Sequence, residues 1–333
     1  MAERWSPLHL RLHRHLLRQP ALLPQGSRLL VALSGGQDSM ALVALLQDLK
    51  RLHHWELQLW HGDHRWRPES SQQATELAAW AEHQGLPIAV DGWPAPSRSE
   101  VAARDWRYGC LERQARKQDC TQVVTAHTAS DRAETLLLHL ARGSHRRGLA
   151  SLRGHRELGE GLQVVRPLLI FSRQDTAQIC EDLQLPIWLD PSNQDPQFSR
   201  NRVRAEVLPV LEALHPGASR RINALAERLA AEDSTRSELL QLALEPLRGD
   251  GNPHRLQRRR LMALSAPNQR DLLHAWLTVS TGLDFGTEQL DTLVARLAPA
   301  QGPGQTDLAG PWHLHWDSTT LHLKIQPNAE PNP

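Results

Sequence analysis

A six-residue run of serine, glycine and aspartate has the composition of an anion-binding loop. Residues 34–39 read Ser-Gly-Gly-Gln-Asp-Ser and lie between an apolar run, 28–33, and a second apolar run with helical spacing, 40–52. Two glycines allow a tight turn that exposes backbone amides to an anion, and the N-terminus of the following helix adds its dipole. The segment therefore predicts a phosphate-binding loop. Its candidate nucleotide contacts are Ser34, Gly35, Gly36, Gln37, Asp38 and Ser39.

This loop differs from two widespread phosphate-binding motifs. The Walker motif ends in Gly-Lys-Ser/Thr, whereas the nearest lysine here is Lys50. The dinucleotide-binding motif Gly-x-Gly-x-x-Gly is not matched either. The structural alternative is an ordinary glycine-rich turn in which Asp38 or Ser39 only caps the helix. We favour phosphate binding because the whole hexapeptide stands between a strand and a helix.

Acidic residues that follow other apolar runs are candidates for metal binding and catalysis. Phosphoryl chemistry on ATP normally uses Mg²⁺ held by carboxylates, and Asp38 and Asp131 are the candidate ligands. Glu134 lies three residues after Asp131, so the two side chains share one face of a predicted helix. The structural alternative for this pair is a capping box, which has the same spacing.

Histidine titrates near neutrality and supplies two further candidates. His64 and His127 each follow a predicted strand, where they are candidate nucleotide contacts or proton carriers. A hydrogen-bonded structural histidine is the alternative for each. Trp66 stands in the same polar loop as His64 and is a candidate for stacking on a nucleobase.

Arginine accounts for 35 of the 38 basic residues, and its planar guanidinium suits phosphates and base edges. Residues 142–156 contain five arginines and two histidines without an acid, and three more arginines lie within 200–204. A solvated basic face is the alternative to RNA binding. Arginines within 255–260 are the second choice for an RNA site. The candidate RNA-phosphate contacts are Arg104, Arg142, Arg146, Arg147, Arg200, Arg202 and Arg204.

The predicted helix over 100–117 carries Arg104 and Arg107 on one face, one turn apart. Both side chains are candidates to reach a substrate phosphate or base. Surface ion pairs with Glu100 and Glu112 are the structural alternative.

A parallel sheet would bring these candidate residues together. Apolar runs predict strands at 28–33, 55–60, 86–90, 121–126 and 162–170. Helical patterns predict helices at 40–52, 70–83, 100–117, 131–142 and 173–183. Strands that alternate with helices indicate a doubly wound α/β fold, Rossmann-like, in which ligands bind at the carboxyl ends of the strands.

The pattern changes after the polar loop at 190–196. Residues 201–247 are predicted to be helical, interrupted at Pro209 and at the turn 215–217. Beyond them we predict helices at 268–279 and 287–297, a loop at 299–304 and a β-hairpin from 312–316 and 320–325. The predicted organisation is a catalytic domain over 1–215, a helical linker with a small α+β domain over 216–327, and a disordered tail at 328–333.

Composition limits the classes that the protein can belong to. A chain of 333 residues with a net charge of +1 needs local patches rather than bulk charge to attract nucleic acid. No apolar run approaches the roughly 18 residues of a membrane span, and residues 1–18 lack the apolar stretch of a secretory signal, so we expect a cytoplasmic protein. Cys110, Cys120 and Cys180 are too scattered for a disulfide framework or a Cys-x-x-Cys site and are predicted to be core thiols.

The loop at 34–39 resembles the signature loop of the N-type ATP pyrophosphatases, the PP-loop family. These enzymes cleave ATP to AMP and pyrophosphate while they adenylate a substrate oxygen. Over residues 25–215 the order of later motifs is similar to the tRNA(Ile)-lysidine synthetases. The matching motifs are Asp63-His64 with Arg67, Glu100-Val-Ala-Ala-Arg104 with Arg107-Tyr108, Thr125-Ala-His127 with Asp131 and Glu134-Thr135, Arg142-Gly-Ser144 with Gly148-Leu149, Arg166-Pro-Leu-Leu169, Asp190-Pro-Ser-Asn193, and Arg200-Asn-Arg-Val-Arg204. Arg65 and His145 depart from the pattern, because the family usually has glycine at both positions.

The resemblance implies a ligase that attaches free lysine to C2 of the wobble cytidine, position 34, of the AUA-reading tRNA(Ile) with a CAU anticodon. ATP would adenylate the C2 carbonyl oxygen, and the ε-amine of lysine would then displace AMP. The resemblance assigns catalysis to Asp38, Asp131, Glu134 and Arg107, and Asp131 or Glu134 would hold or deprotonate the amine. It implies a tRNA-binding accessory domain after residue 261 and is compatible with a homodimer.

Two other functions remain open at this point. A PP-loop tRNA thiolase shares the loop but usually needs catalytic or cluster-binding cysteines, and the chain has no Cys-x-x-Cys. A catalytically inactive RNA-binding module would explain the arginines without chemistry. The intact run 34–39 and Asp131 argue against such a module.

Overall fold

The computed structural model describes residues 5–97, 99–144, 146–150, 152–188, 197–248 and 251–325. The contacts divide the chain into two compact units, 1–230 and 231–333, which we describe separately. The domain boundary near residue 215 stays a prediction, and the tail at 328–333 lies outside the described residues. None of the described helices is long and apolar enough to cross a membrane.

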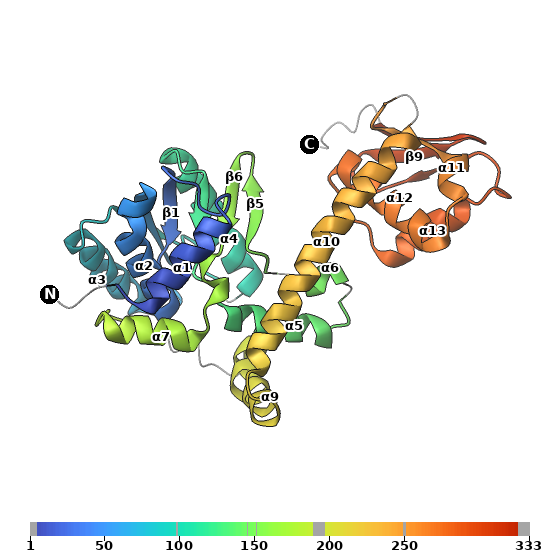
Figure 1. The fold of residues 1–333 in the computed structure, drawn as a ribbon. Helices are drawn as coiled ribbons and strands as arrows, with labels where there is room; N and C mark the ends of the chain where they lie inside the picture. Colours follow the sequence, from blue (N-terminus) through green and yellow to red (C-terminus); the bar gives the residue numbers. More distant parts are fainter. Residues whose placement is uncertain are drawn as a thin grey trace. The chain divides into compact units, whose positions relative to one another are not determined.

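A six-stranded sheet with the order β3-β2-β1-β4-β6-β5 forms the centre of the first unit. Its strands are β1 (Arg28–Ala32), β2 (Glu56–Asp63), β3 (Ile88–Gly92), β4 (Gln122–Val124), β5 (His155–Gly159) and β6 (Leu162–Val165). Every neighbouring pair is parallel except β5 with β6. The predicted α/β class is confirmed, because strands and helices alternate through this unit (Figure 1). The strand order reverses between β1 and β4, where such folds bind ligands.

Helices connect these strands and extend beyond them. The helices before residue 150 are α1 (Pro7–Arg18), α2 (Gln37–His53), α3 (Ser70–His83), α4 (Glu100–Lys117), α5 (Ala129–Ala141) and α6 (Arg146–Leu149). The later ones are the 3₁₀ turn η1 (Pro167–Ile170), α7 (Arg173–Asp182), α8 (Ser199–Arg202), the π-turn η3 (Val203–Val207), α9 (Leu208–Leu214) and α10 (Ala218–Arg248).

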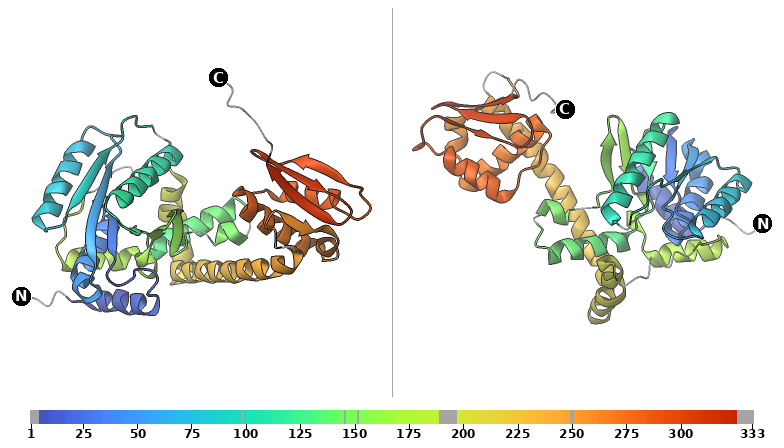
Figure 2. Two further views of the ribbon diagram at one scale, coloured as in Figure 1. Left: turned by 90° about the horizontal axis from the view of Figure 1, so that it is seen from above. Right: turned by 180° about the vertical axis from the view of Figure 1, so that it is seen from behind.

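Two apolar cores hold the helices on opposite faces of the sheet. Leu29 and Val31 of β1 point to one face and pack with α1, α2, α3 and α7. Leu30 points to the other face and packs with α4. This alternation follows from the two-residue period of a strand. Figure 2 shows helices on both sides of the sheet, which is the predicted doubly wound arrangement.

Three parts of this unit differ from the sequence prediction. The predicted strand at 162–170 ends at Val165, because Pro167 has no amide hydrogen for a sheet and begins η1 instead. The edge strand β5 carries charged side chains, which protect an exposed edge but hide the alternating pattern of a strand. In α1, Leu12 and Leu16 are buried one turn apart, while the histidines and arginines around them conceal the helix.

The predicted helical segment from 201 onward is confirmed and begins slightly earlier. It consists of α8, η3 and α9, followed by α10 after the turn at 215–217. Pro209 stands in the first turn of α9, where its missing amide hydrogen removes no helical hydrogen bond.

The second unit contains a four-stranded antiparallel sheet with the order β7-β10-β9-β8. Its elements are β7 (Arg255–Gln257), α11 (Arg258–Met262), α12 (Ala266–Thr281), α13 (Thr287–Arg296), β8 (Gly304–Asp307), β9 (Trp312–Trp316) and β10 (Thr320–Ile325). The hairpin of β9 and β10 has the predicted bounds, whereas the short strands β7 and β8 were not predicted. Apolar residues of the helices and of β9 and β10, with Trp276 fully buried, form a separate core.

The Arg258 side chain connects the segment after α13 to the turn between β9 and β10. The side chain is only 4% exposed and donates to four backbone carbonyls. The acceptors are Leu297 at 3.1 Å, Asp317 at 2.6 Å, Ala298 at 2.9 Å and Gln301 at 2.6 Å. Arg258 is therefore a structural residue, and the alternative RNA site within 255–260 cannot include it.

We predict that Arg258→Met lowers the free energy of unfolding of the second unit by about 3 kcal/mol, because four backbone carbonyls lose their donor and the buried side chain loses its polar contacts. Urea titration of the full chain measures this change. Arg259→Met is the matched control, since Arg259 is exposed on the same helix. Equal stability of the two variants would contradict the structural role.

Candidate active site

The loop after β1 is closed by hydrogen bonds among its own serines. The Ser39 hydroxyl donates to the Gly36 carbonyl over 2.8 Å, and the Ser34 amide donates to Ser39 Oγ over 3.2 Å. Gly36 is the N-cap of α2 and has no side chain to cap it. The leading amides of α2, apart from that of Ser39, which donates to the Gly36 carbonyl over 3.0 Å, are therefore available to an anion.

Gly35 has a conformation and a neighbour that both require glycine. Its φ of +80° lies in the left-handed region, and a Cβ there would come within 3.3 Å of Trp188 Cβ. The Trp188 amide donates to the Gly35 carbonyl over 3.0 Å, and its indole donates to Glu76 over 3.1 Å. The segment after α7 thus packs against the loop, a contact that the sequence does not indicate.

Helix α7 holds the side chains of Gln37 and Asp38 in the loop. The Gln37 side-chain amide donates to the Arg173 carbonyl over 2.7 Å and to the Thr176 hydroxyl over 2.8 Å. The Thr176 hydroxyl donates to Asp38 Oδ1 over 2.5 Å, and Arg173 Nη1 lies 3.5 Å from Asp38 Oδ2. Burial raises the pKa of the Asp38 carboxyl, and Arg173 opposes that effect. Sequence reasoning missed Arg173 and Thr176, because nothing in α7 shows that it faces the loop.

Asp131 and Glu134 meet two arginines that come from α8 and η3. Arg200 donates to Asp131 Oδ1 over 2.9 Å and to Glu134 Oε2 over 2.8 Å. Arg204 donates to Glu134 Oε1 over 2.6 Å. The two arginines are four residues apart in a helical segment with a π-turn and project to the same side. The structure therefore joins predicted acids and predicted RNA contacts in one ionic cluster.

Both acids of this cluster are buried, so their negative charge must be balanced. Glu134 is 0% exposed and Asp131 is 8% exposed, and a buried carboxylate is costly without a partner. Burial alone would raise the pKa of Asp131, but Arg200 and the other polar neighbours bring it below its ordinary value.

The capping box that the sequence suggested has a different register. Asp131 Oδ2 accepts from the Thr128 amide over 2.7 Å and from the Thr128 hydroxyl over 2.9 Å. Thr128 is the N-cap of α5 and Asp131 its third residue. The alternative of a capping box between Asp131 and Glu134 is therefore wrong, because Asp131 is the second member of the box rather than its first.

His127 lies beside the cluster as a neutral side chain. Its Nδ1 is 3.0 Å from the Thr125 hydroxyl. Burial lowers the pKa of His127, Asp131 opposes this, and the positive charges of Arg166 and Arg200 lower the pKa further. At neutral pH His127 is therefore a hydrogen-bonding group for a ligand rather than a cation.

His64 lies in an aromatic group beyond the end of β2. Its ring stacks on Trp66 with 5.1 Å between centroids and meets Trp106 edge-on at 5.0 Å. Trp93 stacks on Trp106 at 5.4 Å. Arg107 Nη2 lies 3.4 Å from His64 Nε2. The group gathers predicted nucleotide and base contacts, although one face of Trp66 is already covered by His64.

The unusual Arg65 adopts the backbone conformation that glycine would have there. Its φ is +51°, in the left-handed region. The Arg65 amide donates to Asp63 Oδ1 over 2.9 Å, and the Ser71 hydroxyl donates to Asp63 Oδ2 over 2.6 Å. The guanidinium packs against Gly92, where no side chain competes for the space. The loop thus retains the turn for which the family usually has glycine.

The other predicted RNA contacts are distributed differently. Arg202 pairs with Glu206 at 2.9 Å on the exposed side of the helix, and Arg142 ends α5 with an exposed side chain. The side chains of Arg146 and Arg147, and all of His145, lie outside the described residues. Phosphate binding by this set therefore stays a prediction, and Arg200 and Arg204 are engaged by carboxylates.

Among the described side chains, Glu112 does not form the ion pair with Arg104 or Arg107 that was part of their structural alternative. Glu112 pairs with Arg116 at 2.9 Å instead. The side chain of Glu100 lies outside the described residues.

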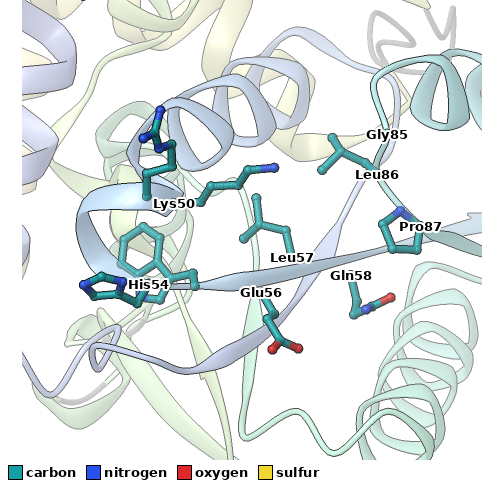
Figure 3. A pocket seen from close by; sticks show the side chains of 10 residues that line it. Lys50, His54, Glu56, Leu57, Gln58, Gly85, Leu86 and Pro87 are labelled. Atoms are coloured by element: carbon teal, nitrogen blue, oxygen red, sulfur yellow. The ribbon is translucent and has the colours of Figure 1, made fainter.

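An open hollow of about 540 Å³ lies at the end of the sheet away from the loop at 34–39. Figure 3 shows its lining, which includes Lys50, His54 and Glu56. These residues come from the end of α2 and the start of β2, so the hollow lies at the amino ends of the strands. Ligands of parallel α/β sheets bind at the carboxyl ends, where the loop and the ionic cluster are.

The three cysteines are buried, as the sequence predicted. Burial raises the pKa of Cys120 and of Cys180 to about 11, so neither is a thiolate at neutral pH. Within the described ranges no group of three or more His, Cys, Asp or Glu side chains could hold a metal ion.

Comparison with known proteins identifies the class of this site. Residues 9–211 match the family model of the PP-loop domain, so the loop at 34–39 and its sheet are those of a PP-loop protein. A U34-tRNA thiolase, NcsA from Methanococcus maripaludis, has a similar fold with a TM-score of 0.56 and 16% identity, covering 67% of this chain and 79% of its own. That likeness concerns the fold alone.

Curated relatives match nearly the whole chain. A tRNA(Ile)-lysidine synthase of Parasynechococcus marenigrum is 52% identical over 329 residues, which is 97% of this chain and 96% of the relative. The synthase of Prochlorococcus marinus strain SARG is 41% identical, with 96% of both chains covered. The synthase of Thermosynechococcus vestitus is 41% identical over 93% of this chain and 90% of its own. The chain belongs to the tRNA(Ile)-lysidine synthase family.

The lowered pKa of His127 predicts an acid-dependent loss of stability. Below the ordinary histidine pKa of 6.5, His127 binds a proton in the unfolded chain but not in the folded protein. The free energy of unfolding therefore decreases as the pH is lowered. His127→Asn should remove up to about 2 kcal/mol of this fall between about pH 7 and pH 5. Denaturant titrations at both pH values measure it. The exposed His83→Asn is the control, and equal pH dependence in both variants would refute the assignment.

Proposed function

We propose that the protein is an ATP-dependent ligase that forms lysidine on tRNA(Ile) from free lysine, releasing AMP and pyrophosphate. The observation that carries this proposal is the PP-loop beside a buried carboxylate cluster, in a chain that is 52% identical to a tRNA(Ile)-lysidine synthase. The PP-loop class supports the use of ATP. A tRNA-modifying reaction on free lysine fits a cytoplasmic enzyme. Sedimentation of the purified protein tests whether it forms a homodimer.

The loop at 34–39 would bind the phosphates of ATP. Its first α2 amides are uncapped, and Ser34 and Ser39 hold the turn in shape. The Gln37 side chain is used by α7, so its contribution to ATP would come from the backbone. His64 and His127 are proposed nucleotide contacts, and His127 acts as a neutral hydrogen-bonding group.

Asp38 and Asp131 are the proposed ligands of Mg²⁺. Magnesium prefers oxygen ligands and is commonly held by one or two carboxylates with substrate phosphates, a donor set that these two residues fit. Burial, together with the negative charge of nearby Asp131, raises the pKa of Asp38, so a cation at the two carboxylates would relieve their repulsion. When bound, Mg²⁺ would neutralise charge on the polyphosphate.

Asp131 and Glu134 are proposed to receive the ε-amine of lysine. An ammonium group with a pKa of about 10.4 must lose a proton before it attacks an adenylated carbon, and a carboxylate can hold the amine or accept that proton. Arg200 and Arg204 occupy carboxylate oxygens in this structure. The amine therefore competes with the guanidinium groups, and an arginine released from the carboxylates would be free to meet tRNA phosphate.

The tRNA would approach the same edge of the sheet. Arg107 is proposed to act at the reacting base next to His64, and Arg104, Arg142, Arg146, Arg147 and Arg202 are proposed phosphate contacts. The CAU anticodon would be bound here, with its wobble cytidine toward the loop. Additional contacts from the second unit are part of the proposal.

The thiolase alternative is disfavoured by the cysteines. A thiolase needs accessible thiolates or cluster ligands, whereas Cys110, Cys120 and Cys180 are buried, and burial raises the pKa of all three. An inactive RNA-binding module would not need the buried Asp131 and Glu134, whose desolvation Arg200 and Arg204 must offset.

One incubation tests the function. Purified protein with ATP, labelled lysine and tRNA(Ile) should give labelled tRNA and equal amounts of AMP, and omission of any component should abolish the labelled product. Formation of ADP, or AMP without lysine transfer to the tRNA, would refute the proposal.

Asp38 provides a sharper test, because its catalytic and structural roles predict opposite results. Asp38→Asn keeps an acceptor for Thr176 and removes only the charge, so turnover should fall roughly 10²- to 10³-fold. Because burial raises the pKa of Asp38, its charge destabilises the fold at neutral pH, and the variant should melt at the same or a higher temperature. Asp182→Ala, exposed at the end of α7, is the control. Normal turnover of Asp38→Asn would make the residue a helix cap only.

A further inference from the structure

Three arginines surround a single tyrosine at the carboxyl edge of the sheet. Tyr108 is the only tyrosine of the chain and lies on α4, one turn after Arg104. Arg156 comes from the start of β5, and Arg166 directly follows β6. The residues are far apart in sequence, and the sheet brings them together.

The contacts of this group are close and specific. Arg156 Cζ lies 4.4 Å from the centroid of the Tyr108 ring, and Arg104 Cζ lies 5.7 Å from it. The phenolic oxygen accepts hydrogen bonds from Arg156 and Arg166. Arg166 is 4% exposed and donates to the Arg153 carbonyl over 2.8 Å, but its buried Nε has no partner. Arg156 Nε is also buried without a partner.

The positive charge of the group is not balanced by acids. Among the described residues no carboxylate forms an ion pair with Arg104, Arg156 or Arg166. Other arginines of α4 are paired, Arg113 with Asp91 at 2.9 Å and Arg116 with Glu112 at 2.9 Å. Among the described residues the three guanidinium groups thus have no carboxylate partner, and the buried Arg166 in particular is costly unless an anion joins it.

The pKa of Tyr108 reflects the positive electrostatic potential of these arginines. Burial alone would raise the pKa of Tyr108, yet Arg166 and Arg156 bring it below its ordinary value. Arg166 also lowers the pKa of His127, so the group borders the proposed active site. The phosphate-binding loop lies on the other side of β4, at the end of β1.

We propose that Arg104, Arg156 and Arg166, with the Tyr108 hydroxyl, form a second phosphate subsite, distinct from the loop at 34–39. Guanidinium groups bind phosphate oxygens in pairs, and the hydroxyl can donate once its oxygen no longer serves the arginines. The subsite belongs to the proposed active site, and the identity of its natural ligand rests on the proposed function. That ligand is a phosphodiester of the bound tRNA next to the reacting cytidine, or the pyrophosphate released from ATP.

Binding measurements distinguish these two sources. If the ligand is tRNA, Arg156→Gln should weaken tRNA binding about tenfold and reduce the slope of log K against log salt by about 0.7 to 0.9, while inhibition by pyrophosphate is unchanged. If the ligand is pyrophosphate, its inhibition constant should rise about tenfold and tRNA binding should not change. Arg116→Gln is the control, because Arg116 lies on α4 like Tyr108 but is paired with Glu112.

The lone tyrosine allows a second readout that a purely structural role would not affect. In protein made with isotope-labelled tyrosine, the single Tyr108 signal should titrate at higher pH when tRNA or inorganic pyrophosphate is added, because a bound anion disfavours the phenolate. Tyr108→Phe should weaken binding of the same ligand while the protein stays folded.

Three results would overturn the subsite. They are a Tyr108 titration that neither ligand shifts, binding by Arg156→Gln equal to that of Arg116→Gln, and an effect confined to the KM for lysine. The Tyr108 titration and the tRNA-binding measurements need no turnover, so their outcome is separable from failure of the proposed function. A wild-type protein that forms no lysidine refutes the function and leaves these measurements intact.

Discussion

The ionic cluster of Asp131, Glu134, Arg200 and Arg204 is the constraint on which the rest of the site depends. Glu134 has no exposed surface, so its charge is tolerable only because two guanidinium groups share it. The arginines come from a helical segment about 70 residues further along the chain. The cluster therefore fixes α8 and η3 against α5, beside the carboxyl edge of the sheet. A cationic group that entered the cluster would have to replace the arginines at the carboxylates.

The phosphate-binding loop has a corresponding dependence on its neighbours. Gly35 turns in the left-handed region beneath Trp188, and Gln37 and Asp38 are held by α7. The hexapeptide thus has its shape only when the segment after β6 has folded against α2. Asp38 remains under electrostatic strain there, because burial raises the pKa of its carboxyl. A preorganised charge of this kind is what stabilisation of a reacting phosphate requires.

Positive charge is divided between two tasks that composition alone does not separate. Arg258 joins helices and sheet of the second unit, and Arg200 and Arg204 balance buried acids. Arg156 and Arg166 instead surround Tyr108 without a carboxylate partner among the described residues. Since the fold is shared with a tRNA thiolase of 16% identity, the sheet by itself does not define the function.

The sequence by itself determined the α/β class, most helices and strands, and the loop at 34–39, because apolar periodicity and a glycine-rich turn are local properties. Its ordered motifs also indicated the family. The helix α1 and the edge strand β5 escaped because charged side chains interrupt their apolar patterns. Only the tertiary structure decided that Arg200 and Arg204 face Asp131 and Glu134, that Thr176 supports Asp38, and that Arg156 and Arg166 meet at Tyr108. Such partners lie far apart in the chain, and packing and the balance of buried charge select them rather than sequence spacing.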